Sequence, residues 1–306
     1  MFYVFFTTKR LLSFAEKTKH ICADATYKLL QHGYPLLVVG TTDKARMFHP
    51  FGIALCSNEK SEAFSFIFKS IKECILTVYN YDYEPNVLVA DAAEATTNAF
   101  ESIFHELQYR VMCWFHMRKA YEDHSSYAAI EKQFKEQIKQ DIYTLQLCES
   151  EEIFDAAYAL FKRKWLNKSK AVENFINDYF DKIWIQQHPG WYEGFAPGIP
   201  STNNGLESNN GFIKEQATLR KRLPLGRFLE IVKNEMIEKW SKERDPNKPF
   251  CKDFCDSPPI EHALWVQAFH MDIDDRHTLT ITNKTKTKTT YMSSALFDPF
   301  DNTNSI

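Results

Sequence analysis

A polar segment at residues 201–214 has the chemically most informative spacing in the chain. Four of its side chains are spaced four, three and four residues apart, which places them on one face of a helix: Asn203, Glu207, Asn210 and Lys214. This face presents carboxamides around a single carboxylate, whereas an ordinary surface helix mixes charges of both signs. Ser201 or Thr202 would cap the helix. By itself the pattern also fits a capped, solvated helix.

Two further carboxylates are placed by the predicted strands. Asp24 lies within an apolar segment at residues 20–30, and Asp91 directly follows the continuous apolar run Val87–Ala90, which is typical of a strand buried on both faces. Neighbouring strands would bring these two carboxylates together. Carboxylate oxygens are the ligands that hard divalent cations prefer.

The elements that must position these groups follow a recognisable order. Strands are predicted at residues 20–30, 34–41, 48–56, 87–90 and 110–115. A helix capped by Ser57 or Asn58 follows the third strand, and a second helix at residues 95–107 follows the fourth. Three antiparallel strands extended by parallel ones through helical crossovers are the order of an α/β, ribonuclease-H-like mixed sheet, although the pattern alone leaves several mixed folds open. The positions of Asp24 and Asp91 on adjacent strands favour the ribonuclease-H-like sheet.

The remainder of the chain changes character. Residues 117–200 show long amphipathic patterns and end in a loop rich in Pro and Gly, so we expect an all-helical insertion or subdomain before the helix that carries Glu207. We therefore divide the chain into residues 1–116 as the first part of the core, 117–200 as the insertion, 201–245 as the glutamate helix and C-terminal helix, and 246–306 as a loosely ordered extension.

Composition narrows the class of protein. The chain has 306 residues, 44% hydrophobic and 15% aromatic, enough for a large folded core. A formal net charge of −3 excludes nucleic-acid binding by overall basic charge, so any DNA contact must be local. Seven scattered cysteines favour free thiols, and no apolar run is long enough for a signal peptide or a membrane span. We expect a soluble intracellular protein.

Four motifs occurring in order are together more specific than any one of them. They are CADATYK at residues 22–28, VLVADAAEATTNAF at 87–100, CWFH at 113–116 and TNNGLESNN at 202–210. This combination resembles the catalytic domain of the Mutator-like element (MULE) transposase family across roughly residues 2–240. The resemblance implies a DDE-type acidic triad of Asp24, Asp91 and Glu207.

The same resemblance implies chemistry and partners. Two Mg²⁺ or Mn²⁺ ions would support DNA strand cleavage and transfer, with Asp24 bridging both ions, Asp91 binding one and Glu207 the other. The partner would be double-stranded DNA, as transposon ends and target, bound by a homo-oligomer in the nucleus. Some relatives carry zinc-binding modules on either side of the core; these are not found here, so a truncated element is one expectation.

Several residues are accessory candidates that also have simpler explanations. Cys113 and His116 have the spacing of half a zinc site, but a buried strand cysteine and a packed histidine at the strand's end explain them as well. Asn203, Asn210 and Lys214 accompany the glutamate. The run Arg220, Lys221 and Arg222 is a candidate for DNA backbone contact or an ordinary solvated face. Cys251 and Cys255, with the histidines that follow, match no standard zinc finger.

Two other functions fit parts of this pattern. One is a domesticated, non-catalytic nuclear DNA-binding or chromatin-associated protein that kept the transposase fold. The other is an unrelated metal-dependent phosphohydrolase with acids at strand ends.

Overall fold

The computed structural model describes residues 1–43, 46–243, 278–282 and 289–293. The chain divides into two compact units, Met1–His116 with Gly198–Ser257, and Met117–Pro197 with Pro258–Ile306. The three predicted carboxylates lie in the first unit. The predicted extension at residues 246–306 lies mostly outside the described residues, as do Cys251 and Cys255.

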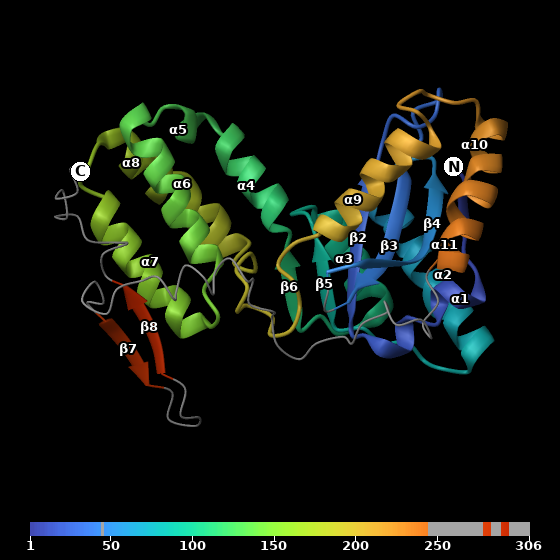
Figure 1. Ribbon diagram of the computed structural model, residues 1–306, viewed down its shortest axis with the longest axis horizontal. Helices are drawn as coiled ribbons and strands as arrows, with labels where there is room; N and C mark the ends of the chain where they lie inside the picture. Colours follow the sequence, from blue (N-terminus) through green and yellow to red (C-terminus); the bar gives the residue numbers. More distant parts are fainter. Residues whose placement is uncertain (44–45, 244–277, 283–288, 294–306) are drawn as a thin grey trace. The chain divides into compact units, whose positions relative to one another are not determined.

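A six-stranded mixed sheet forms the centre of the first unit, in the order β1-β4-β3-β2-β5-β6 (Figure 1). The antiparallel part contains β1 (Tyr3–Phe6), β4 (Phe48–Cys56), β3 (Leu36–Thr42) and β2 (His20–Thr26). The parallel part adds β5 (Val87–Ala90) and β6 (Tyr109–Met112). This mixed α/β architecture is compatible with the predicted ribonuclease-H-like class.

The strands follow the predictions closely where apolar residues are continuous. β4 and β5 have the predicted bounds, while β2 ends at Thr26 rather than near Leu30. β6 stops at Met112, so the strand predicted to reach residue 115 was too long: Trp114 begins α4 (Trp114–Asp123), and its backbone N–H donates to Ser201 O at 2.8 Å. The edge strand β1 was not predicted.

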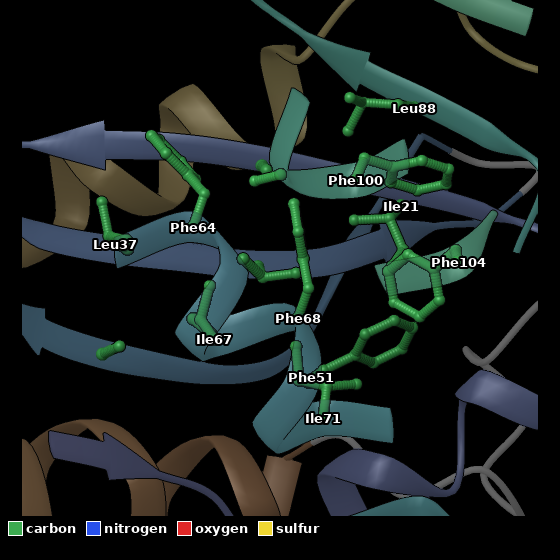
Figure 2. Packing of buried hydrophobic residues seen from close by; sticks show 14 of the residues in the cluster. Ile21, Leu37, Phe51, Phe64, Ile67, Phe68, Ile71, Leu88, Phe100 and Phe104 are labelled. Carbon is green, nitrogen blue, oxygen red and sulfur yellow. The ribbon is translucent and has the colours of Figure 1, made fainter. Parts of the chain in front are cut away.

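Two helices cover one face of the sheet. α2 (Ser61–Tyr79) and α3 (Glu94–Phe104) pack their rings against strand residues of the core, which Figure 2 shows. Phe68 lies 5.9 Å from Phe100 between ring centroids, with the planes close to perpendicular. The N-cap of α2 is Lys60, not Ser57 or Asn58, because the chain first turns through residues 57–60.

β2 separates this apolar core from the opposite face. Ile21 and Ala23 belong to the core beneath α2 and α3. Side chains alternate along a strand, so Asp24 projects to the other face. That alternation is the local reason why β2 carries a carboxylate without placing it in the apolar core.

The opposite face carries the helix predicted from the Asn-rich segment. α9 (Asn204–Phe212) lies against β2, β3 and β4 (Figure 1) and continues as the wider turns of η3 (Ile213–Ala217). Its N-cap is Asn203 rather than Ser201 or Thr202, and the Asn203 side chain donates to Val89 O at 3.3 Å instead of capping the helix. Ser201 is buried, with its carbonyl already bonded to Trp114.

The rest of the first unit completes its surface. The short helices α1 (Lys9–Leu12) and η1 (Ala15–Lys17) join β1 to β2, and the final helical run comprises α10 (Leu225–Ile231), η4 (Val232–Ile237) and α11 (Glu238–Glu243). Thr8 caps α1 and bonds to Ser241 at 3.0 Å, which ties the first helix to the last.

The regular structure among the described residues of the second unit consists of helices and one hairpin. Beyond α4 come α5 (Ser125–Ala128), α6 (Lys132–Gln146), α7 (Glu151–Trp165), α8 (Lys170–Asn174) and η2 (Phe175–Gln187). A buried Asp141 receives Lys164 at 2.9 Å and the indole N–H of Trp165 at 2.7 Å, which joins α6 to α7. The hairpin contains β7 (Thr278–Thr282) and β8 (Thr289–Ser293). No helix among the described residues is both long and apolar enough to cross a bilayer.

The ring packing beneath α2 gives a stability prediction. Replacing the fully buried Phe68 with Ala should lower the free energy of unfolding by ~3–5 kcal/mol, because it removes a ring and leaves a cavity. Leu76→Ala on the same helix is the matched control, since Leu76 is 48% exposed and should change stability little. Urea denaturation measures both. Equal losses in the two variants would contradict this assignment of the core.

Candidate active site

The candidate site begins at the C-terminal end of β2. Asp24 is half-buried there, on the face of the sheet that carries α9. Its Oδ2 accepts a 2.7 Å hydrogen bond from Nδ2 of Asn210, a residue distant in sequence but buried on α9. The helix therefore fixes the orientation of this carboxylate.

Glu207 lies on α9 one turn before Asn210. Its Oε1 is 3.2 Å from His116 Nε2, and both side chains are about one-third exposed, at 29% and 31%. Ligand atoms of Asp24, His116 and Glu207 all lie within 4.8 Å of one another. Three elements that are far apart in the chain thus bring two carboxylates and an imidazole together.

Asp91 stands at the tip of the neighbouring parallel strand. The register pairs Cys22 with Val89, which sets Asp24 and Asp91 at corresponding positions beyond it. Asp91 Oδ1 accepts the backbone N–H of Ala93 at 3.1 Å, and its carbonyl accepts the Arg110 guanidinium. Asp91 does not join the group whose ligand atoms lie within 4.8 Å, although its charge acts on the site.

Two carboxyl groups of the site, Asp24 and Glu59, have raised pKa values. Burial, then the charge of Glu207, raises the pKa of Asp24 to about 7; Asp91 and Glu59 contribute in the same direction, and a backbone hydrogen bond from Ala25 opposes them. Burial and then the Asp91 charge raise the pKa of Glu59 to about 7. Carboxylates that lie close together repel each other when ionised, and a bound cation would offset that repulsion.

Glu59 was missed from the sequence. It lies half-buried in the segment between β4 and α2, with no strand tip or helical spacing to mark it. Only its Coulomb interaction with Asp24 and Asp91 associates it with the site. The one available signal was topological, because the third strand of the predicted sheet ends just before it.

His116 and Cys113 form the side of the site next to Glu207. The structure corrects their predicted strand location: Cys113 follows β6, and His116 lies in the first turn of α4. A hydrogen bond with the Cys113 thiol raises the pKa of His116, burial opposes that shift, and the nearby charges of Glu207 and Asp91 raise it further. His116 Nε2 and Glu207 Oε1 form an ion pair whenever His116 is protonated.

The start of α9 is anchored to the same region. Asn203 is fully buried; its backbone N–H donates to Cys113 Sγ at 3.2 Å, and its amide donates to Val89 O. Lys214 lies farther along, in η3, where its carbonyl accepts the Thr218 hydroxyl at 3.0 Å. Asn203 is therefore an anchor of the helix, while Lys214 is not among the residues brought into contact with the carboxylates.

The donor set suits a divalent cation. Two carboxylates and an imidazole lie within 4.8 Å of one another, and the side-chain oxygens of Asn203 and Asn210 are buried without a hydrogen-bond partner. Carboxylate and carboxamide oxygens are the ligands of Mg²⁺ and Mn²⁺, whereas imidazole is more typical of softer ions. Asp24 and Glu207 fit the hard cations best, and His116 fits a role beside them.

The basic run follows η3 in an exposed turn. Arg220, Lys221 and Arg222 are all exposed, and Arg220 pairs with Glu215. Leu223 exchanges backbone hydrogen bonds of 2.9 and 3.0 Å with Leu29 and Gln31, which follow β2. The turn is thereby fixed to the loop that extends from the Asp24 strand.

Part of the chain matches the model of a known protein family. Residues 20–120 match the family model described as MULE transposase domain. The matched segment contains Asp24, Asp91, Cys113 and His116, but not Glu207. No curated protein matches the chain.

The raised pKa of Asp24 predicts a pH dependence in cation-free protein. The folded state binds more protons than the unfolded state between about pH 4 and 7, so the free energy of unfolding should fall as pH rises through that window, by up to ~1.4 kcal/mol per pH unit. Glu207→Gln removes a neighbouring negative charge and should lower the pKa of Asp24, which flattens the fall. Urea denaturation across pH and carboxyl ¹³C shifts measure both effects.

The matched control for this titration is Glu101→Gln, on an exposed position of α3. It should leave the pH dependence of wild type unchanged. An Asp24 carboxyl that titrates near its ordinary value of 3.8 in wild type would contradict the crowding described above.

Proposed function

We propose that this chain, whose residues 20–120 match the MULE transposase domain, is a member of that family and that its first unit is a DNA transposase catalytic domain. The proposed reaction is two-metal-ion cleavage and transfer of DNA strands, with Asp24, Asp91 and Glu207 as the acidic triad. The proposed cofactor is Mg²⁺ or Mn²⁺.

One observation carries the proposal most directly. Asp24 and Glu207, separated by most of the chain, have carboxylate atoms within 4.8 Å of each other and of His116. Like charges at this distance repel, as the raised pKa of Asp24 reflects. A divalent cation bound between the two carboxylates would offset this repulsion, which supports the proposed metal site.

The proposed roles of the three carboxylates are supported by their positions. Asp24, between the other two elements, would contribute to both cation positions, with Asp91 at one and Glu207 at the other. Bound divalent cations supply activation of the attacking water or 3′-hydroxyl and stabilisation of the leaving oxygen at phosphorus. Asp91, already bonded to the Ala93 N–H, would be preorganised by its own loop.

The surrounding side chains position these groups. Asn210 holds Asp24 through its amide, and His116 holds Glu207 through Nε2. Cys113 and Asn203 fix the first turn of α9, so that Glu207 stays near β2. All four are positioning residues in this proposal, since none needs to touch the reacting phosphate.

The proposal extends to the organisation of the chain and to its partners. Residues 117–200 would be an all-helical insertion that interrupts the core between residues 1–116 and the glutamate helix with its C-terminal partner at 201–245, followed by an extension at 246–306. Double-stranded DNA, as transposon ends and target, would be bound by a homo-oligomer in the nucleus. The exposed turn of Arg220, Lys221 and Arg222 would contact the DNA backbone.

Loss of the triad should abolish cleavage while the fold persists. Asp24→Asn and Glu207→Gln should each reduce Mg²⁺- or Mn²⁺-dependent nicking of a labelled duplex by at least about 100-fold, the scale on which loss of one charge-stabilising group acts. Glu101→Gln is the control and should retain wild-type nicking. Circular dichroism establishes that each variant is folded.

The outcomes separate the rival functions. Metal-dependent nicking that survives Asp24→Asn contradicts the triad. DNA binding without nicking in any variant favours a domesticated, non-catalytic DNA-binding protein. Hydrolysis of small phosphate esters in preference to DNA favours an unrelated phosphohydrolase.

The basic turn gives a separate prediction. Replacing Arg220, Lys221 and Arg222 together with Ala should weaken DNA binding at all sequences and reduce the salt dependence of log K by about 2–3, because each phosphate contact contributes ~0.9. The matched control replaces three other exposed cations of the first unit: Lys17, Lys19 and Lys69. Fluorescence anisotropy at several salt concentrations measures both. If both triple replacements weakened DNA binding equally, the turn would make no specific contact with the DNA backbone.

A further inference from the structure

A cavity of about 530 Å³ lies behind the glutamate helix, on the side of α9 away from Asp24. We propose that it binds one unpaired nucleotide of the DNA strand being processed. This inference rests on the proposed DNA function, although the cavity itself belongs to no part of the carboxylate site.

Helix α9 has two chemically distinct polar faces. Glu207 and Asn210 face His116 and Asp24, as the distances above establish. A second set of its residues lines the cavity instead: Asn204, Gly205, Ser208, Asn209 and Phe212. Helix α9 thus contributes residues both to the carboxylate site and to the cavity. A DNA strand that reaches Glu207 lies within one helix diameter of the cavity.

The buried side-chain amide of Asn209 indicates a polar ligand in the cavity. Its side chain is only 8% exposed and lines the cavity, yet its Nδ2 is buried with no hydrogen-bond partner. A buried amide donor without a hydrogen-bond partner is unfavourable, because its lost hydration is not compensated. A carboxamide carries both donors and acceptors, the combination that pairs with the edge of a nucleobase.

The walls suit a flat, aromatic ligand. Phe48 and Trp240 are buried at the cavity surface, and Phe212 adds a third ring. Aromatic faces stack on bases of any sequence, because every base has a π face. The volume also falls within the ~300–1,000 Å³ of small-ligand sites.

The charge at the rim suits a phosphate. Lys239 Nζ lies 4.7 Å from the Phe212 ring centroid and 3.8 Å from Glu243 Oε1, and the Arg46 residue also lines the cavity. Lys239 is exposed, so its ammonium can reach a phosphate outside while the base enters. The cavity thus offers the Asn209 amide to the edge of the base, aromatic rings to its face and Lys239 to the phosphate.

Helix α9 lies very close to the start of β4 beside the cavity. A Cβ on Gly205 would stand 2.7 Å from Arg46 O and 3.1 Å from Phe48 N, so only glycine lets α9 lie this near the start of β4. A base within a duplex is stacked and paired and does not enter such a cavity. An extruded or single-stranded nucleotide does.

The test compares two DNA duplexes that differ only at one 2-aminopurine, which is paired in one and unpaired in the other. Wild type should bind the unpaired form on the order of tenfold more tightly, the value of one satisfied buried amide, with a change in 2-aminopurine fluorescence. Asn209→Leu should lose most of this preference and keep the affinity for the paired duplex. Asn98→Leu, an exposed helical position of the same unit, should behave as wild type.

A second variant covers the case in which Asn209→Leu does not fold. Lys239→Gln changes an exposed side chain and should reduce the same preference several-fold through its lost phosphate contact. Equal wild-type affinity for both duplexes, or a preference that survives in both folded variants, overturns the nucleotide pocket and leaves the proposed catalytic function standing.

Absence of DNA binding altogether would count against the proposed function instead. The pocket is then decided by free deoxynucleoside monophosphates, with saturation-transfer NMR as the readout. Saturable binding that disappears in Asn209→Leu supports the pocket, and no binding by wild type overturns it.

Discussion

The candidate site depends on how α9 is held against the strand that carries Asp24. The buried Asn210 amide donates to Asp24, and Asn203 fixes the other end of the same face to Val89 and Cys113. Between these two anchors, Glu207 has little freedom to move away from Asp24. The helix therefore supplies both the second carboxylate and the hydrogen bond that orients the first.

This arrangement opposes the stability of the isolated fold. Two carboxylates and a half-buried Glu59 share one region, and burial with mutual repulsion raises the pKa of Asp24 and of Glu59 to about 7. The apolar packing of α2 and α3 lies on the other face of the sheet, so the charged face is constrained without being part of the core. A cation bound at the proposed site would offset this repulsion and so stabilise the folded state.

Much of the fold was predictable because its signals are local. The bounds of β4 and β5 follow from continuous apolar runs, and the proximity of Asp24 and Asp91 follows from parallel strand ends. β1 was missed because four residues give too little pattern. The position of His116 was wrong because nothing local distinguishes a strand ending at residue 115 from one ending at Met112 and followed by a helix.

Other parts of the site exist only in three dimensions. Glu59 approaches Asp91 through chain folding alone, and the unpartnered Asn209 amide acquires meaning only beside Trp240 and Phe48. The Asn-rich helix itself was predicted, but its capping was not, because Asn203 bonds to the sheet edge instead of to its own helix. Sequence spacing identified the face that carries Glu207, whereas the use of the opposite face required the structure.

The most direct test of the central claim, that Asp24 and Glu207 form one cation site, is Mn²⁺ binding followed by electron paramagnetic resonance. Wild type should take up Mn²⁺ saturably, Asp24→Asn and Glu207→Gln should each lose that binding, and Glu101→Gln should retain it. Equal Mn²⁺ uptake by wild type and the folded Asp24→Asn variant would contradict the account.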